Sequence, residues 1–261
     1  MTLTGRNQAL RLALTLVIPV VAAVVVTLSQ AVRVGVGAAP INLSIDQLFA
    51  VTGALVSVGL GLILAVVYLR LFRRTPSLSV FFVIWFFLSM AIDVSKLGQV
   101  ILPGSPWPQL VPVVSRVSIF GHIAGVMALF SAGLYEGGVR MQRHGTAMFV
   151  AVLIAVGLSW SVPIDTSVLP PHLVYPAGMR ASLQATLVLL LVVAVVNYVE
   201  AAISSGNPRQ LSAAAAVFLL ATGREILFYQ TAPLWIVVGA GAVLAGGVLF
   251  AVHNFRDFLV S

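Results

Sequence analysis

Apolar runs of membrane-spanning length constrain this chain more than any motif does. Sixty per cent of its 261 residues are hydrophobic, 8% are charged, and the mean hydropathy is +1.10. A water-soluble protein of this composition would expose large apolar patches. A bilayer core instead accepts apolar helices of about 20 residues. The sequence therefore predicts an all-α integral membrane protein whose main partner is the lipid bilayer.

Eight runs are long enough to cross a bilayer, and we expect them to form one polytopic helical domain over residues 1–261. The predicted spans are 12–32, 48–70, 78–98, 112–137, 146–162, 180–203, 210–230 and 234–252. The first run resembles a secretory signal, but about 20 apolar residues is long for the core of a signal. The segment that follows it, "VRVGVGAAP", is also a poor cleavage site. We therefore keep the first run as a span.

The basic residues predict how the chain is oriented, because cytoplasmic loops carry an excess of Lys and Arg. With both termini in the cytoplasm, nine basic residues fall on the inner side and four at the outer ends of spans. The inner residues are Arg6, Arg11, Arg70, Arg73, Arg74, Arg140, Arg143, Arg209 and Arg256, and the outer ones are Arg33, Lys96, Arg116 and Arg180. This distribution favours eight spans with both termini inside, in a membrane of the bacterial inner-membrane type.

The connections on the predicted outer side are long and rich in proline. They read "LPGSPWPQLVP" at 102–112 and "WSVPIDTSVLPPHLVYPAG" at 160–178. Proline fixes φ and removes a backbone donor, so we expect ordered caps here. A soluble ligand would meet the protein on this side.

Charged residues inside the runs are the strongest candidates for a site. Arg224 and Glu225 interrupt the apolar run 210–230, while Asp93 and Lys96 fall in the outer third of the run 78–98. Each such group costs about 2.5–3.5 kcal/mol on insertion scales, so it needs a partner or a purpose. At 1.5 Å of rise per residue these charges lie at one depth.

Arg116, near the outer start of the run 112–137, completes this set of three positive and two negative charges. In a structural interpretation, Arg224 pairs with Asp93, and Glu225 pairs with Arg116 or Lys96. In a functional interpretation, the surplus positive charge binds an anionic solute or lipid headgroup, with Arg as a bidentate donor. Tyr229, one turn beyond Glu225, would add a hydroxyl group.

His122 lies near the midplane of the run 112–137, and three roles remain open for it. It can hydrogen-bond to a neighbouring helix, relay protons to the cluster above, or ligate a haem. The other histidines lie in loops or at the inner end of the last run, so no second axial ligand has a matching depth. We therefore expect no cofactor. The absence of Cys also excludes thiolate metal sites.

Small residues recur at helical spacing in two runs. They are Gly121, Gly125, Gly133 and Gly137 in the fourth run, and Gly241, Ala242, Ala245 and Gly246 in the last. Such faces let helices approach closely. They can pack the bundle internally or form a homo-oligomer or an interface with another membrane protein.

Three functions remain open on these observations. The first is a non-enzymatic receptor-like sensor or a subunit of a membrane assembly, which would act through a partner because the last segment, "HNFRDFLVS", is short. The second is a small-solute or proton-coupled transporter, and the third is a lipid-modifying enzyme that uses the charged cluster. The sequence contains no HExxH, GxSxG or Walker A motif, which favours the first. The basic residues form no stripe, so no nucleic-acid partner is expected.

Overall fold

The computed structural model describes Thr15 and residues 43–72, 77–104, 107–138, 144–206 and 210–260. Within these residues the protein is helical, and the only strand-like pairing is an isolated bridge between Ile164 and Ala177. The α-helices are α2 (Ile45–Leu71), α3 (Leu78–Ala91), α4 (Ser95–Ile101), α5 (Val111–Glu136), α6 (His144–Ser161), α7 (Arg180–Ser204), α8 (Gln210–Tyr229) and α9 (Pro233–Val260). Three short 3₁₀ segments join them: η1 (Ile92–Val94), η2 (Leu102–Gly104) and η3 (Pro108–Leu110).

Among the described residues, six helical stretches are long and apolar enough to cross a membrane, as expected for a polytopic membrane protein. They are Ile45–Leu71, Leu78–Ile101, Pro108–Glu136, Arg180–Ser204, Gln210–Tyr229 and Pro233–Asn254. The predicted run 146–162 is also helical, but its apolar part, Thr146–Ser161, is shorter than the other six. The predicted run 12–32 lies outside the described residues.

Capping side chains set the beginnings of two of these helices. Ser44 accepts a hydrogen bond from the Gln47 amide at 3.2 Å, and the Gln47 side chain accepts one from the Ser44 amide at 3.0 Å. This reciprocal capping box satisfies two backbone donors that a helix start leaves free. Ser77 caps α3 with a single hydrogen bond, which its side chain accepts from the Val80 amide. These capping residues therefore fix the first residues of α2 and α3 just before the apolar runs.

The third predicted run does not form one regular helix. Its α-helical pattern is interrupted by η1, and α4 then continues to Ile101. A mid-helix 3₁₀ turn changes the backbone hydrogen-bond pattern and often marks a functional position. Here η1 contains Asp93, one of the charges that the sequence singled out.

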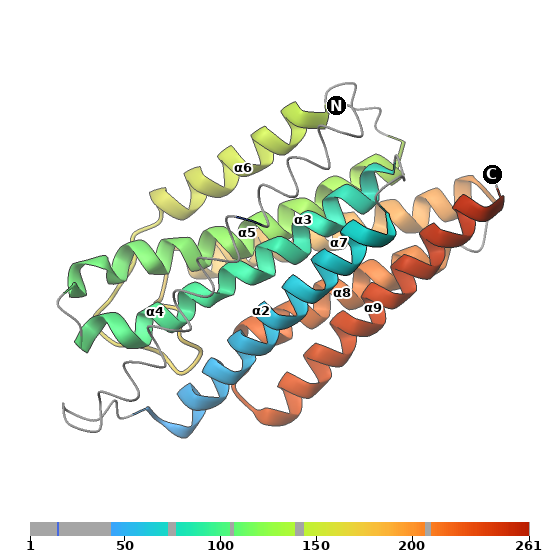
Figure 1. Cartoon of the computed structure of the whole chain (residues 1–261). Coiled ribbons are helices and arrows are strands. Elements are labelled where there is room, and N and C mark those ends of the chain that lie inside the picture. The colour runs from blue at the N-terminus through green and yellow to red at the C-terminus, as the bar shows by residue number, and fades with distance from the viewer. Residues whose placement is uncertain are drawn as a thin grey trace.

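The helices lie alongside one another, with α6 at the edge of the bundle beside α5 (Figure 1). The main core is centred on large side chains of α3 and α5 such as Phe86, Phe87 and Leu129, each fully buried. α8 and α9 form a tight hairpin in which a Cβ added to Gly223 would lie 2.7 Å from the Gly239 carbonyl. Backbone contact of this kind requires glycine.

The glycine face of α5 also packs inside the bundle. A Cβ at Gly121 would collide with Ile92, and one at Gly133 would lie 2.8 Å from the Ala194 backbone of α7. On α9, Gly239 and Gly246 both pack closely on α8, while nothing lies within 4 Å of the Cβ position of Gly241. Internal packing, one of the two predicted roles, is therefore confirmed for these α5 glycines.

The loops at one end of the bundle bring distant parts of the chain together. The ends of α4 and α8, the starts of α5 and α7, and the proline-rich segment 162–179 all lie at this end (Figure 1). We call it the pocket end, for a feature described below. Hydrogen bonds between Asp165 and Pro176 and between Gly178 and Pro163 order the 162–179 segment. The prediction of an ordered cap is thus confirmed for this segment.

Candidate functional site

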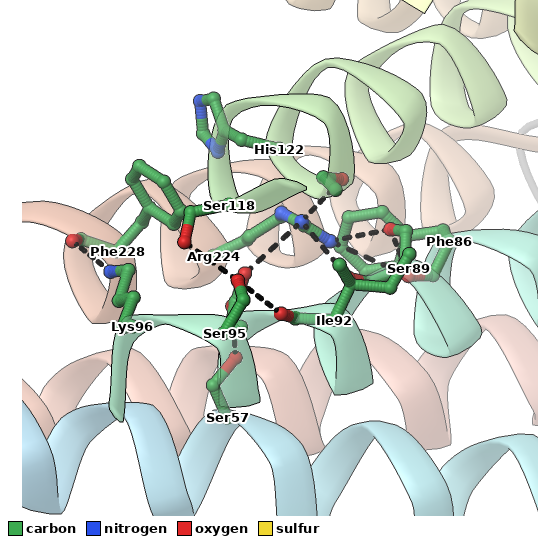
Figure 2. A network of polar contacts seen from close by, with 12 residues as sticks. Ser57, Phe86, Ser89, Ile92, Ser95, Lys96, Ser118, His122, Arg224 and Phe228 are labelled. Carbon is green, nitrogen blue, oxygen red and sulfur yellow. Dashed lines mark hydrogen bonds and ion pairs between the residues drawn. The ribbon is translucent and has the colours of Figure 1, made fainter. Parts of the chain in front are cut away.

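Arg224 lies in the interior, where protein groups surround its guanidinium. It is 1% exposed, and Nη1 donates to Ser89 Oγ at 2.7 Å while Nη2 donates to the Gly121 carbonyl at 2.9 Å. Longer contacts reach the carbonyl groups of Phe86 and Ser89. Figure 2 shows these bonds crossing between α3 and α5, with Arg224 reaching in from α8. Arg224 therefore ties three helices together.

The backbone around Arg224 is shaped to accept it. A Cβ added to Gly125 would lie 2.5 Å from Ser89 Oγ and 2.6 Å from Arg224 Nη1, so a larger residue at this position would displace one of these two groups. The carbonyls of Phe86 and Ser89 lie just before η1, where the change of helix type alters the regular bonding pattern and lets lone pairs accept from a side chain. The GxxxG spacing of α5 thus makes room for a charge.

Asp93 is the counter-ion of Arg224, as the sequence predicted. Its Oδ1 lies 3.7 Å from Arg224 Nη2, and its Oδ2 accepts a hydrogen bond of 2.7 Å from Ser57 on α2. Both charged side chains are 1% exposed. A pair this deeply buried is costly to desolvate, and removing either member would leave an uncompensated charge. The pair therefore locks α2, η1 and α8 to one another.

Lys96, the only lysine in the chain, occupies the same interior level. Its Nζ donates to the Phe228 carbonyl at 2.6 Å and lies 3.6 Å from the centroid of the Phe228 ring. With 2% exposure it does not face solvent. Its ammonium is held by a carbonyl and an aromatic face, an arrangement that stabilises a desolvated cation.

The predicted partner of Glu225 is wrong. Glu225 pairs with neither Lys96 nor Arg116; its Oε1 lies 3.2 Å from His122 Nε2. Arg116 lies instead over the Trp160 ring, with 5.4 Å from its guanidinium carbon to the ring centroid. Depth along a helix, which placed these charges at one level, does not fix which way each side chain turns.

His122 belongs to a different environment from Arg224. Its imidazole turns away from the Arg224 network in Figure 2 and stacks on the Phe228 ring, with centroids 4.1 Å apart. The side chain is 3% exposed, yet neither ring nitrogen makes a hydrogen bond among the described residues, although Nε2 lies 3.2 Å from Glu225 Oε1. An orphaned buried nitrogen is uncommon in native proteins and marks a position where a partner is missing.

The His122 ring lines a pocket. This pocket lies between α5, α7, α8 and the 162–179 segment, at the pocket end of the bundle. The pocket has a volume of about 430 Å³, counting the open space at its mouth. Its wall is largely apolar, with Ile119, Ile123, Val174, Leu183, Leu187 and Phe228, and its polar members are His122, His172, Tyr175, Arg180, Gln184 and Tyr229.

The start of α7 supplies positive potential to this pocket. Arg180 is the first residue of the helix, and the N-cap residue, Met179, makes no side-chain capping bond. A helix start carries unpaired amide groups and a partial positive charge, which together favour anions. Arg180 adds a full charge and a planar set of donors. The combination makes this wall of the pocket suited to an oxyanion.

The aromatic ring of Tyr229 contacts two histidine rings in the pocket lining. Tyr229 contacts both histidines, with 5.6 Å to the His122 centroid and 6.0 Å to the His172 centroid. Burial, together with the smaller effects of the nearby charges of Arg180 and Lys96, lowers the pKa of His172 to about 4. His172 is therefore neutral at pH 7 when the pocket holds no anion.

The structure divides the seven predicted site residues among three places. Two line the pocket, His122 and Tyr229, and Glu225 contacts it through His122. Arg224, Asp93 and Lys96 lie in the packed interior, and Arg116 lies on Trp160. Sequence reasoning missed His172, Arg180 and Gln184. The proline-rich loop that contains His172 and precedes Arg180 was the available signal, since ordered loops frequently carry binding residues.

Comparisons with known proteins add no assignment: no protein-family model matches the chain, and no curated protein matches it.

Proposed function

We propose that this protein is a non-enzymatic membrane module, a receptor-like sensor or a subunit of a membrane assembly, that binds an anionic amphipathic molecule in the pocket. The observation that carries the proposal is the convergence of Arg180, the uncapped start of α7 and the unpartnered, buried His122 on one largely apolar pocket. The ligand's oxyanion would lie at Arg180. Its apolar body would lie along Ile119, Ile123 and Leu187.

The contacts of Arg224 support a structural role for this residue and leave ligand binding to the pocket. Its guanidinium already has carbonyl, hydroxyl and carboxylate partners, so an entering anion would have to displace them. Its role in the proposal is to hold the walls of the pocket at fixed distances. The shared ligand chemistry, an oxyanion on an apolar body, belongs both to membrane lipids and to free amphipathic acids.

A binding role agrees better with the middle of the bundle than transport does. Residues 80–88 of α3, "VFFVIWFFL", are all apolar, and all except Trp85 are buried. They separate the pocket end from the polar contact of Ser79 with Glu136 near the other end of α3 and α5. A transporter needs a polar or hydrated route between its two sides, and this stretch opposes one.

The proposal also includes the number of membrane spans and their orientation. We infer eight spans with both termini cytoplasmic in a bacterial inner membrane, which puts the pocket end outside. The excess of basic residues on the opposite side supports this orientation. A partner or second copy would pack on α9, where Gly241 has nothing within 4 Å of its Cβ position.

Binding of octane-1-sulfonate, compared with octan-1-ol, tests the proposed site. The sulfonate stays ionised at all working pH values, and the alcohol has the same chain without the charge. Purified wild-type protein should bind the sulfonate more tightly than the alcohol. Arg180→Gln should weaken sulfonate binding about tenfold or more, because a charge-assisted contact contributes about 1.5–3 kcal/mol.

Arg116→Gln is the matched control, since it removes the same charge at the same end of the bundle outside the pocket lining. It should leave sulfonate binding unchanged. If wild-type protein bound the sulfonate and the alcohol equally well, the proposed site would be refuted. An equal loss of sulfonate affinity in Arg180→Gln and Arg116→Gln would also refute it.

A further inference from the structure

The positive charge of Lys96 has no acidic partner close to it. Lys96 is 2% exposed, and no carboxylate of the described residues lies within ion-pair distance of its ammonium. Asp93, three residues earlier, contacts Arg224, while Glu225 faces His122. A desolvated cation inside a membrane protein is costly and marks a functional position.

Lys96 is fixed to the end of α8. Its Nζ donates to the carbonyl of Phe228, which lies in the last turn of α8, where carbonyl groups have no partner within the helix. A cation at this position also offsets the partial negative charge of a helix C-terminus. The ammonium is therefore held at one place relative to the residues that end α8.

The Phe228 ring separates the Lys96 ammonium from His122. The ammonium lies 3.6 Å from the ring centroid, and the His122 imidazole stacks on the ring with centroids 4.1 Å apart. These distances are too short for both groups to lie on one face of the ring, and Figure 2 shows Phe228 between them. Phe228 and His122 line the pocket. Lys96 therefore lies directly behind this wall of the pocket.

The charge of Lys96 reaches the space inside the pocket. The pKa of His172, another lining residue, is lowered by burial first, and then by the charges of Arg180 and Lys96. Arg180 is exposed at the start of α7, whereas Lys96 is buried. Salt screens a buried charge much less than an exposed one. The pocket therefore experiences two cations in different environments.

We propose that Lys96 is a specificity-determining residue of the pocket, because its buried charge, acting across the Phe228 ring, favours an anionic ligand over a neutral one. The inference rests on the proposed function and adds to it a second cation that does not touch the ligand. The bound anion supplies the negative charge that Lys96 lacks in the chain. Arg180 contacts the anion directly, and Lys96 sets the potential behind the opposite wall.

The ratio of the dissociation constants of octan-1-ol and octane-1-sulfonate measures this selectivity. Lys96→Gln keeps a donor for the Phe228 carbonyl but removes the charge. It should weaken sulfonate binding about fivefold, less than Arg180→Gln does, because the charge acts at a distance. Binding of the alcohol should be unchanged. Lys96→Arg keeps the charge and should keep the ratio of wild-type protein, as should the control Arg116→Gln.

Salt concentration separates the buried charge from the exposed one. In about 1 M salt the screening length falls to about 3 Å. The difference in sulfonate affinity between wild-type protein and Lys96→Gln should persist there. The difference between wild-type protein and Arg180→Gln should shrink.

The outcomes distinguish this inference from the proposed function. If Lys96→Gln lost affinity for both ligands equally, or for neither, the ratio would be unchanged and the inference would be overturned. A Lys96→Gln effect that disappears in high salt would overturn it as well. Lys96→Met serves as a second neutral variant if Lys96→Gln does not fold. Wild-type protein that shows no preference for the sulfonate would instead refute the proposed function itself.

Discussion

Individual residues at the pocket end fall into two groups with different chemical situations. Arg224 and Asp93 are charged and bonded to protein groups, whereas His122 is buried without a hydrogen bond on either ring nitrogen. The first group was predictable from sequence, because few charges occur inside the apolar runs and each must find a partner. The partner of Glu225 was not, since it depends on the rotation of α5 and α8 about their axes.

Replacing Gly125 by Ala should disrupt the Arg224 network. The new Cβ would lie within 2.6 Å of both Ser89 Oγ and Arg224 Nη1, so one of them must move. Overpacking of this kind costs about 1–3 kcal/mol. Thermal unfolding in detergent should therefore show a lower melting temperature for Gly125→Ala.

Gly241→Ala provides the control for that experiment, because nothing lies within 4 Å of its added methyl group. Alanine also has the better helix propensity, so this variant should be unchanged or slightly more stable. Equal melting temperatures for the two variants would show that the close packing around Gly125 is not present.

The Arg224 and Asp93 pair should show strong coupling in a double-mutant cycle. Arg224→Met alone leaves Asp93 as a buried, uncompensated charge and should destabilise the protein by about 3–5 kcal/mol. Adding Asp93→Asn should recover part of this loss, because the stranded carboxylate is gone. Additive effects of the two substitutions on the free energy of unfolding would mean that the two groups do not interact.

Among the structural elements, the helices were predictable and the loop that closes the pocket was not. Runs such as 112–137 and 180–203 correspond to α5 and α7 within about one residue at each end. Their lengths follow from the bilayer and from capping residues close to them in sequence. The 162–179 segment was predicted to be ordered, but its placement of His172 and Arg180 over α5 and α8 depends on contacts with distant helices.

The 162–179 segment should make stability depend on pH through His172. Its pKa in the folded protein is about 4, below the ordinary 6.5, because burial disfavours the charged ring. Between these values the unfolded chain binds more protons than the folded one, so stability falls as pH falls from about 6.5 to about 4. Above pH 6.5 the contribution is fully present.

Melting temperatures measured across this range for wild-type protein and His172→Gln would test that expectation. As the pH is lowered, the melting temperature of wild-type protein should fall more than that of His172→Gln. A constant difference would show that His172 has the same pKa in both states. The other ionisable groups are common to the two proteins, so their contributions cancel in the comparison.

The whole molecule is a bundle of apolar helices with an apolar middle, and we propose that the pocket at one end binds a ligand. Its orientation can be tested directly because the chain contains no Cys. In intact cells, Ser167→Cys in the 162–179 segment should react with a membrane-impermeant maleimide. Ser204→Cys, at the far end of the roughly 37 Å α7, should react only after the membrane is opened. The reverse pattern would invert the orientation and put the pocket in the cytoplasm.

The most direct test of the pocket is native mass spectrometry of wild-type protein, Arg180→Gln and Arg116→Gln, each extracted gently from its own membrane. We expect one bound anionic molecule on wild-type protein and on Arg116→Gln, and its loss from Arg180→Gln. The mass of that molecule would distinguish a membrane lipid from a free acid. A wild-type protein without any bound anion, or with the same anion on all three proteins, would contradict the assignment of this pocket as the ligand site.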